Sequence, residues 1–381
     1  MGQEPHILFD ATCVVPTGKG ASVHALAVLA HLASMQLAVR MTALLREEMR
    51  GRTGPLAGVE FKHVAVGSSL LWRMWTLPAI VRQMRPSVLH IFGETPLGPV
   101  PVPFTLSVHE LPHLYRKYSR SRPAGTREIA SSLGNLLLPS TCRRAGGIVA
   151  LSRSTASDLI RSYRVKPNRI GVAYPAADSR FFETNPDSNT RTLDALTKPY
   201  ILTFATNDPR ELPNHAIRAF VKVADRIPHC LVIAGRCPEA LRTRLIDSVP
   251  SELSADRIHF TGFLRDEELP TLYRNSAVYL ELSAYEGFGL QACEAMASGT
   301  PVIASNVSSL PEVVGDAGIL VENGDTQKLA STIVSLVTDP QEAARRSALG
   351  RAQASKFSWP HCADETWRVI RGVIDEKKAR T

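Results

Sequence analysis

Residues 200–205 read Tyr-Ile-Leu-Thr-Phe-Ala, and residues 231–235 read Leu-Val-Ile-Ala-Gly. Both runs are short and are apolar nearly throughout. Strands of this kind are typical of a parallel sheet, because helices cover both of its faces. The two runs therefore favour an α/β fold around a buried parallel sheet.

Similar runs recur in two series separated by the polar segment Ala176–Lys198. The first series comprises His6–Asp10, Met41–Leu45, Val59–Val64, Val88–Phe92, Phe104–Val108, Gly147–Leu151 and Ile170–Tyr174. The second comprises Tyr200–Ala205, Cys230–Ala234, Ile258–Thr261, Val278–Leu282, Pro301–Ser305 and Gly318–Val321. Apolar residues at helical spacing lie between them, in Ala21–Met35, Ser154–Tyr163, Asn214–Ile227 and Asp325–Val337. This alternation predicts two Rossmann-like, doubly wound domains, residues 1–176 and 177–358, with ligands at the carboxyl ends of the strands in a cleft between the domains.

The composition gives a basic balance over 381 residues, with 44 Lys and Arg against 36 Asp and Glu and a net charge of +8. Such a charge invites a nucleic-acid or anionic-membrane partner. No helix-turn-helix, zinc or RNA-binding aromatic motif accompanies it, so we expect no nucleic-acid partner. The six cysteines are scattered without a CxxC pair, which favours reduced thiols in a cytoplasmic protein over structural zinc or disulfides.

Two stretches bear on a membrane location. Leu71–Trp75 mixes Trp with Arg and suits a membrane or acceptor contact, although an amphipathic helix packed on the first sheet is the preferred interpretation. The densest basic cluster is Arg116, Lys117, Arg120, Arg122 and Arg127, which could attract an anionic acceptor or membrane, with a solvated face as the preferred alternative. No apolar run reaches about 18 residues, and Met1–Leu8 has no leader-like region, so we expect a cytoplasmic protein with, at most, peripheral contact at the inner face of a membrane.

The stretch Tyr285–Ala304 carries the most chemistry. A strand before it, a turn at Glu286–Gly289 and a helix from about Leu290 to Ala297 would bring a glycine-rich turn to a helix N-terminus, where anions are favoured. Glu286 and Glu294, eight residues apart, could accept hydrogen bonds from sugar and ribose hydroxyls. The plainer alternative is a solvated turn for Glu286 and a capping or surface acid for Glu294.

This stretch resembles the Glu-x7-Glu signature of the retaining glycosyltransferases of family four, which have the GT-B fold. The resemblance extends over nearly the whole chain, through Thr17–Ser22, Val108–Leu111, Ile148–Ile160, Phe260–Tyr273, Ser305–Gly318 and Phe357–Trp359. It implies that the two domains face a central cleft. It also implies that residues 359–381 form a helical segment that crosses back to the first domain.

The resemblance also implies roles for individual residues. Catalytic roles fall to His109 and Glu286, and the acceptor side would include His109 with Glu110. The donor-binding residues would be Gly18, Gly20, Arg210, Glu286, Gly287, Phe288, Gly289, Leu290 and Glu294. Glu286 would bind donor-sugar hydroxyls and Glu294 the ribose. For His109 the alternative is a partly buried histidine that satisfies a local backbone group.

The family pattern fails after the first strand of the second domain, where relatives carry an Arg and a Lys that grip the diphosphate. Here the Arg position is Thr206 or Asn207, and the Lys position is Glu211 or Leu212. Arg210 is the only Lys or Arg between residues 204 and 215. Three interpretations stay open: Arg210 replaces the clamp, Arg210 is a solvated loop residue, or the enzyme is weakened or inactive.

The expected function is a metal-independent, retaining transfer of a hexose from a UDP- or GDP-sugar to a hydroxyl of a saccharide or lipid-linked saccharide, as in polysaccharide biosynthesis. The hexose would be mannose-, rhamnose- or glucose-like. No Asp-x-Asp metal signature occurs, and no cofactor beyond the donor is expected. Alternatives are a transferase that decorates small metabolites, a nucleotide-sugar epimerase or hydrolase, and a non-catalytic nucleotide-sugar binder.

Overall fold

The computed structural model describes residues 4–16, 18, 20–93, 95–115, 136–183, 199–206, 208, 210–251, 253 and 257–380. The chain divides into two compact units. The first comprises residues 1–113, 121–175 and 358–381, and the second comprises residues 114–120 and 176–357. The basic cluster from Arg116 to Arg127 lies outside the described residues. Each unit is described by itself below.

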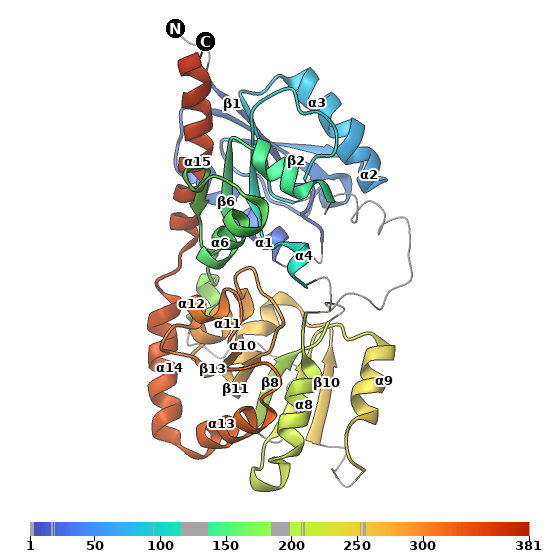
Figure 1. Cartoon of the computed structure of the whole chain (residues 1–381), viewed down its shortest axis with the longest axis vertical. Coiled ribbons are helices and arrows are strands. Elements are labelled where there is room, and N and C mark those ends of the chain that lie inside the picture. Colours follow the sequence, from blue (N-terminus) through green and yellow to red (C-terminus); the bar gives the residue numbers. More distant parts are fainter. Residues whose placement is uncertain are drawn as a thin grey trace. The chain divides into compact units, whose positions relative to one another are not determined.

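The first unit is built on a parallel sheet of seven strands in the order β3-β2-β1-β4-β5-β6-β7 (Figure 1). In that order the strands are Val59–Val64, Arg40–Arg46, His6–Asp10, Val88–Ile91, Phe104–Val108, Gly147–Ala150 and Ile170–Val172. Helices of this unit include α1 (Ala21–Ser34), α2 (Ser69–Leu71), α3 (Leu77–Met84), α6 (Arg153–Tyr163) and α15 (Trp359–Arg380). The short helix α4 (Pro112–Tyr115) follows β5. Nearly every residue of the inner strands β1, β4, β5 and β6 is buried, as expected of a sheet covered on both faces.

Helix α15 packs against α1 and strands β4–β7 of the first unit (Figure 1). Its close approach depends on two glycines in the sheet. A Cβ atom at Gly147 would lie 2.6 Å from Val369 Cγ1, and one at Gly171 would lie 2.5 Å from Val369 Cγ2. Because real Cβ atoms do not tolerate such contacts, the helix can lie this close only over strands without side chains at these positions.

The second unit has a parallel sheet of six strands in the order β10-β9-β8-β11-β12-β13. In that order the strands are Ile258–Gly262, Cys230–Ala234, Tyr200–Phe204, Ser276–Glu281, Val302–Ser305 and Ile319–Val321. The helices are α8 (Pro213–Val221), α9 (Glu239–Asp247), α10 (Leu269–Arg274), α11 (Leu290–Ala297), α12 (Leu310–Val314), α13 (Thr326–Thr338) and α14 (Pro340–Ala354). Ile201, Leu231 and Leu280 of the sheet share one core with Phe220 of α8 and Ile333 of α13.

Two expected helices differ from the structure. The run Asn214–Ile227 is not one helix: α8 ends at Val221, and a separate 3-10 turn covers Ala224–Arg226. Pro228 accounts for the end of that turn, because a proline disfavours helical backbone in the residue before it, and Ile227 is extended.

The Trp-rich stretch holds a wide π-helical turn at Trp72–Thr76 rather than a regular amphipathic helix. Trp72 is buried and its Nε1 donates to Asp10 Oδ2 at 3.3 Å, while the buried Arg73 donates from Nε to Thr95 O at 2.6 Å. Trp72 and Arg73 therefore belong to the packing of the first unit. Trp75 is exposed.

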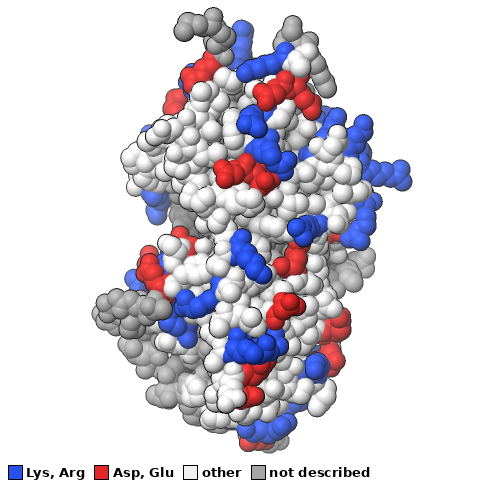
Figure 2. Space-filling view, turned by 90° about the vertical axis from the view of Figure 1, so that its left-hand side faces the viewer, with Lys and Arg blue, Asp and Glu red and all other residues white. Residues whose placement is uncertain are grey.

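Basic and acidic side chains are interspersed over much of the face in Figure 2, which carries α14 and α15. Within these helices, Glu342 pairs with Arg345 and Arg346, and Glu365 pairs with Arg368. Such mixed charge is typical of a solvated surface rather than of a nucleic-acid interface. Within the described ranges, no helix combines the length and apolar character that a bilayer crossing requires.

Candidate active site

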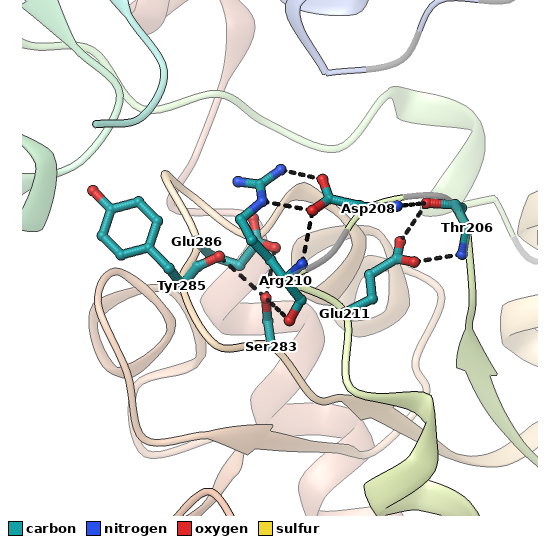
Figure 3. Close-up of polar contacts among 7 residues, drawn as sticks. All are labelled: Thr206, Asp208, Arg210, Glu211, Ser283, Tyr285 and Glu286. Atoms are coloured by element: carbon teal, nitrogen blue, oxygen red, sulfur yellow. Dashed lines mark hydrogen bonds and ion pairs between the residues drawn. The ribbon is translucent and has the colours of Figure 1, made fainter. Parts of the chain in front are cut away.

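In the second unit, the loop between β11 and α11 is fixed by serine hydroxyls. Ser283 Oγ lies 3.0 Å from Glu286 Oε1, and the Glu286 backbone N–H donates to Ser308 Oγ at 2.7 Å (Figure 3). Ser309 Oγ donates to the carbonyl oxygens of Glu286 and Phe288 at 3.0 and 2.9 Å. Glu286 is only partly exposed. It is therefore a held side chain with a fixed backbone, and not the solvated turn residue of the plainer interpretation.

Gly289 begins helix α11 and is required for two reasons. Its φ of +97° lies in the left-handed region, and a Cβ atom there would lie 2.6 Å from Leu310 Cδ2. The Cys293 N–H donates to the Gly289 carbonyl at 3.2 Å, which closes the first turn of the helix. The N–H groups of Leu290, Gln291 and Ala292 precede that bond and have no intrahelical acceptor, so this end of α11 favours an anion.

Glu294 lies on α11 beside a buried tyrosine of α10. The Tyr273 hydroxyl donates to Glu294 Oε2 at 3.3 Å, and Tyr273 itself has no exposed surface. The Thr300 hydroxyl donates to the Tyr273 carbonyl at 2.6 Å. Glu294 is thus neither a helix cap nor a surface acid, since a side chain from the core orients its carboxylate.

A third carboxyl group, missed from the sequence, lies at the end of β11. Glu281 is 5% exposed, and the Tyr279 hydroxyl lies 2.9 Å from its Oε2. Burial, followed by the charge of Glu286, raises the pKa of Glu281 well above its ordinary value. A glutamate that ends an otherwise apolar strand run, Val-Tyr-Leu-Glu-Leu, was the signal that could have revealed it.

The loop after β8 holds the residues that stand at the family's Arg and Lys positions (Figure 3). Arg210 pairs with Asp208, from Nη2 to Oδ2 at 2.5 Å and from Nε to Oδ1 at 2.9 Å. Glu211 accepts hydrogen bonds from the backbone N–H and the hydroxyl of Thr206. Burial raises the pKa of Glu211. The solvated-loop interpretation of Arg210 is wrong, because its side chain is 14% exposed and ion-paired.

This loop also contacts the Glu286 loop. The Arg210 carbonyl accepts from the Ala284 N–H at 2.8 Å and from Ser283 Oγ at 3.4 Å. Ser283 thereby lies between Arg210 and Glu286 (Figure 3). The structure brings together Arg210, Glu286, the Gly287–Leu290 turn and Glu294 at the carboxyl edge of the second sheet.

The remaining predicted residues belong to the first unit, at the carboxyl edge of its sheet. His109 follows β5, and its Nε2 lies 3.0 Å from the carbonyl of Phe92. Since a carbonyl can only accept, Nε2 carries the proton and Nδ1 is an acceptor. Burial lowers the pKa of His109 to about 4, so the ring is neutral at pH 7. The backbone contact of the alternative interpretation is thus present, and Nδ1 is the ring atom that can still accept a hydrogen bond. Glu110 beside it is half-buried.

The two glycines of the N-terminal loop lie before α1. A Cβ atom at Gly18 would lie 1.9 Å from Ser22 Oγ, whose hydroxyl donates to the Cys13 carbonyl. Gly20 is the N-cap of α1 and has a φ of +54°. Both glycines thus permit the tight entry into the helix.

His24 is a further residue that the sequence did not reveal. It is 1% exposed, and neither of its ring nitrogens has a hydrogen-bond partner in the part of the chain that the structure describes. Its ring packs edge-on against His109, with centroids 5.0 Å apart. Within the described ranges, no group of three His, Cys, Asp or Glu is arranged to hold a metal ion.

Comparison with protein families gives two matches that follow one another along the chain. Residues 18–181 match the model of Glycosyltransferase Family 4, and residues 187–353 match that of Glycosyl transferases group 1. The chain belongs to glycosyltransferase family 4. The first match includes Gly18, Gly20 and His109, and the second includes Arg210, Glu286 and Glu294.

Two mannosyl- or glycosyltransferases are among the proteins similar to this family 4 chain. It is 31% identical to the O-antigen chain mannosyltransferase B of Escherichia coli over 229 residues, 58% of each chain. It is 34% identical to the D-inositol 3-phosphate glycosyltransferase of Rhodococcus opacus over 235 residues, 58% of this chain and 53% of that one. The matched region thus spans somewhat more than half the length of these relatives.

Solved structures of similar fold cover nearly the whole chain. The crystal structure of Anabaena HepE in complex with UDP and glucose has a TM-score of 0.73 and 19% identity, and covers 97% of this chain and 100% of that one. The two parallel sheets of seven and six strands are therefore those of the GT-B fold.

Proposed function

We propose that this family 4 chain is a metal-independent, retaining glycosyltransferase that moves a hexose from a UDP- or GDP-sugar to a hydroxyl group of a saccharide or a lipid-linked saccharide. The observation that carries the proposal is the placement of Glu286 and Glu294 on either side of the α11 N-terminus. One held carboxylate before a helix N-terminus and a second one turn into the helix suit a ligand that has hydroxyl groups on both sides of an anionic centre.

The donor would bind in the second unit. Glu286 would accept hydrogen bonds from hydroxyls of the transferred sugar, and Glu294, oriented by Tyr273, would accept them from the ribose. The diphosphate would lie at the N-terminus of α11, beside Gly287, Phe288, Gly289 and Leu290, and Arg210 of the adjoining loop would be its basic contact. The helix end and the guanidinium would stabilise the charge that develops on the leaving diphosphate.

The acceptor would bind in the first unit near His109 and Glu110. A neutral His109 is protonated on Nε2, so Nδ1 could accept a hydrogen bond from the incoming hydroxyl. With a pKa of about 4, His109 would orient that hydroxyl rather than remove its proton. The leaving phosphate would take the proton on the face from which it departs, which gives retention of the anomeric configuration.

The comparisons support a hexose and a uridine nucleotide as first choices. A mannosyltransferase is among the similar curated proteins, and the HepE structure was determined with UDP and glucose. We therefore rank UDP-glucose and GDP-mannose first. The scattered cysteines favour a reducing, cytoplasmic location, and peripheral contact with an anionic membrane stays part of the proposal.

A thermal-shift series with UDP, GDP, ADP and their sugars tests the proposal. A nucleotide at about 100 times its Kd should raise the free energy of unfolding by about 2.7 kcal/mol. The donor that binds is then offered to hydroxyl acceptors, and NMR of the product should show the donor's anomeric configuration. Absence of any shift contradicts the proposal, and an inverted product contradicts the retaining mechanism.

The same series separates the alternatives. Donor turnover without an acceptor indicates an epimerase or a hydrolase. Tight binding without turnover across an acceptor panel indicates a nucleotide-sugar binder. The Asp208–Arg210 ion pair is the observation that favours this last alternative, because it engages the basic side chain that we propose for the diphosphate.

A further inference from the structure

The loop after β8 satisfies its own hydrogen-bond donors with two carboxylates. Asp208 accepts from the backbone N–H and Nε of Arg210, each at 2.9 Å, and from Nη2 at 2.5 Å. Glu211 accepts from the backbone N–H and the hydroxyl of Thr206. These five donors of Thr206 and Arg210 are the kind that bind phosphate oxygens. The loop therefore carries two carboxyl groups of its own around donors that could otherwise bind a phosphate.

The bond between Asp208 and Arg210 has the geometry by which arginine also binds phosphate. A guanidinium presents parallel N–H groups, and both carboxylates and phosphates accept them in pairs. Nε and Nη2 of Arg210 face the two Asp208 oxygens (Figure 3). A phosphate that bound this edge of Arg210 would need the same two donor atoms, so it must displace Asp208.

The ion pair is accessible enough to open. The side chain of Asp208 is 30% exposed and that of Arg210 is 14% exposed. Because water reaches part of the pair, separation of the two charges costs less than it would in a dry interior. A doubly charged diphosphate can compete successfully with a single carboxylate under these conditions, although it loses part of its affinity in doing so.

We propose that Asp208 is an affinity-determining residue, an internal competitor that occupies the Arg210 guanidinium in place of the donor's diphosphate. The proposal rests on the proposed function, since it takes the ligand to be a nucleoside diphosphate or its sugar. Asp208 weakens the binding of both the donor and the nucleoside diphosphate product. Removal of its charge strengthens both.

Asp208→Asn is the sharpest variant. The Asn side-chain oxygen can still accept from the Arg210 backbone N–H and Nε, so the turn is kept, while the negative charge and the Nη2 bond are lost. We expect UDP and GDP, titrated calorimetrically at low ionic strength, to bind about threefold to tenfold more tightly than to the parent protein. Uridine and guanosine, which have no phosphate, should bind with unchanged affinity.

A second variant and a matched control complete the test. In the double variant Asp208→Asn/Arg210→Ala the gain should vanish, because the guanidinium that Asp208 occupies is absent. Asp178 is the control, because it has the same Asp-x-Arg spacing in the same unit. Its Oδ1 accepts a hydrogen bond from the Arg180 backbone N–H at 3.1 Å and forms an ion pair with Arg180 Nε at 3.9 Å. Asp178→Asn removes an equal charge and should leave UDP and GDP affinity unchanged.

The outcomes separate the two levels of the proposal. If UDP or GDP binds the parent protein and Asp208→Asn binds it equally or more weakly, the role of Asp208 is overturned and the proposed function stands. An equal gain from Asp178→Asn also overturns it, because the effect would then be one of net charge. If neither nucleotide binds any of these proteins, the proposed function fails, and the role of Asp208 fails with it.

Discussion

The hydroxyl of Tyr273 on α10 donates a hydrogen bond to Glu294 Oε2 on α11, over 3.3 Å. Tyr273 is fully buried against Phe181, Phe204 and Tyr279, so its hydroxyl has a fixed position. The core of the second unit therefore determines where the proposed ribose-binding carboxylate lies.

Replacement of Tyr273 by Phe should weaken nucleoside diphosphate binding. The variant keeps the ring and its packing but loses the bond that orients Glu294, so we expect the Kd for UDP or GDP to rise about threefold to tenfold. Isothermal titration calorimetry measures the change. Tyr200→Phe is the matched control, because its buried hydroxyl donates to the Leu272 carbonyl instead. An equal loss of affinity in both variants would show that the Tyr273 effect is structural.

Replacement of Arg210 by Ala should lower kcat/KM by on the order of tenfold or more. A charge-assisted hydrogen bond to a phosphate is worth about 1.5–3 kcal/mol, and the variant also leaves Asp208 and Glu211 without that cation. Steady-state kinetics with the donor found by thermal shift provides the measurement. Arg244→Ala on α9 removes the same charge from an exposed position and controls for net charge. Unchanged kcat/KM and donor KM in Arg210→Ala would exclude Arg210 from the diphosphate site.

Replacement of Gly289 by Ala should destabilise the protein and impair donor binding. An alanine is strained at this positive φ, and its Cβ would also clash with Leu310 Cδ2. We therefore expect the free energy of unfolding to fall by about 2–4 kcal/mol. Gly324→Ala separates the two costs, because Gly324 has a φ of +94° and open space around its Cβ position. Urea denaturation of both variants is the measurement. Equal losses would mean that the Leu310 contact costs nothing.

Replacement of His24 by Phe should reduce the acid sensitivity of the fold. Burial lowers the pKa of His24 well below 6.5. Below pH 6.5 the unfolded chain therefore binds a proton that the folded chain does not, and stability falls as the pH falls. Between pH 6.5 and 5, the slope of the free energy of unfolding against pH should therefore be smaller in the variant, by up to about 1.4 kcal/mol per pH unit. The variant should also gain about 1 kcal/mol at pH 7, because it removes two buried nitrogens that have no hydrogen-bond partner among the described residues.

Urea denaturation at pH 7, 6 and 5 measures the slope for His24→Phe. His361→Gln, at an exposed position of α15, controls for the loss of one imidazole. A slope equal to that of the parent protein in His24→Phe would contradict the assignment. The buried His90 and His109, whose pKa values burial lowers to about 3 and about 4, should contribute to the slope that remains.

Much of the fold follows from the sequence because buried parallel strands have an unmistakable composition. The runs His6–Asp10, Val59–Val64 and Cys230–Ala234 are strands with these bounds, and helix α11 covers Leu290–Ala297 as expected. Errors arose where backbone chemistry overrides apolar spacing. Pro228 ends the helical run after α8, and the Trp72 stretch widens into a π-helical turn.

The site was harder to predict because pairing and burial depend on residues distant in sequence. Glu286 and Glu294 could be selected from their spacing, since one strand, one turn and one helix determine their positions. Glu281 and His24 could not, because their surroundings come from other elements. The Asp208–Arg210 pair is local in sequence. Even so, the sequence alone did not decide whether Arg210 is a phosphate-binding residue or a solvated loop residue.

The position of α15 has a consequence for biosynthesis. Strands β6 and β7 carry glycines under Val369 of α15. This part of the first sheet therefore packs against a helix that is synthesised about 200 residues later. The second unit, whose sheet and helices come from residues 176–357, is complete before that helix emerges. During translation the second unit should therefore reach its native packing first. The sheet of the first unit should stay partly uncovered until α15 has been synthesised.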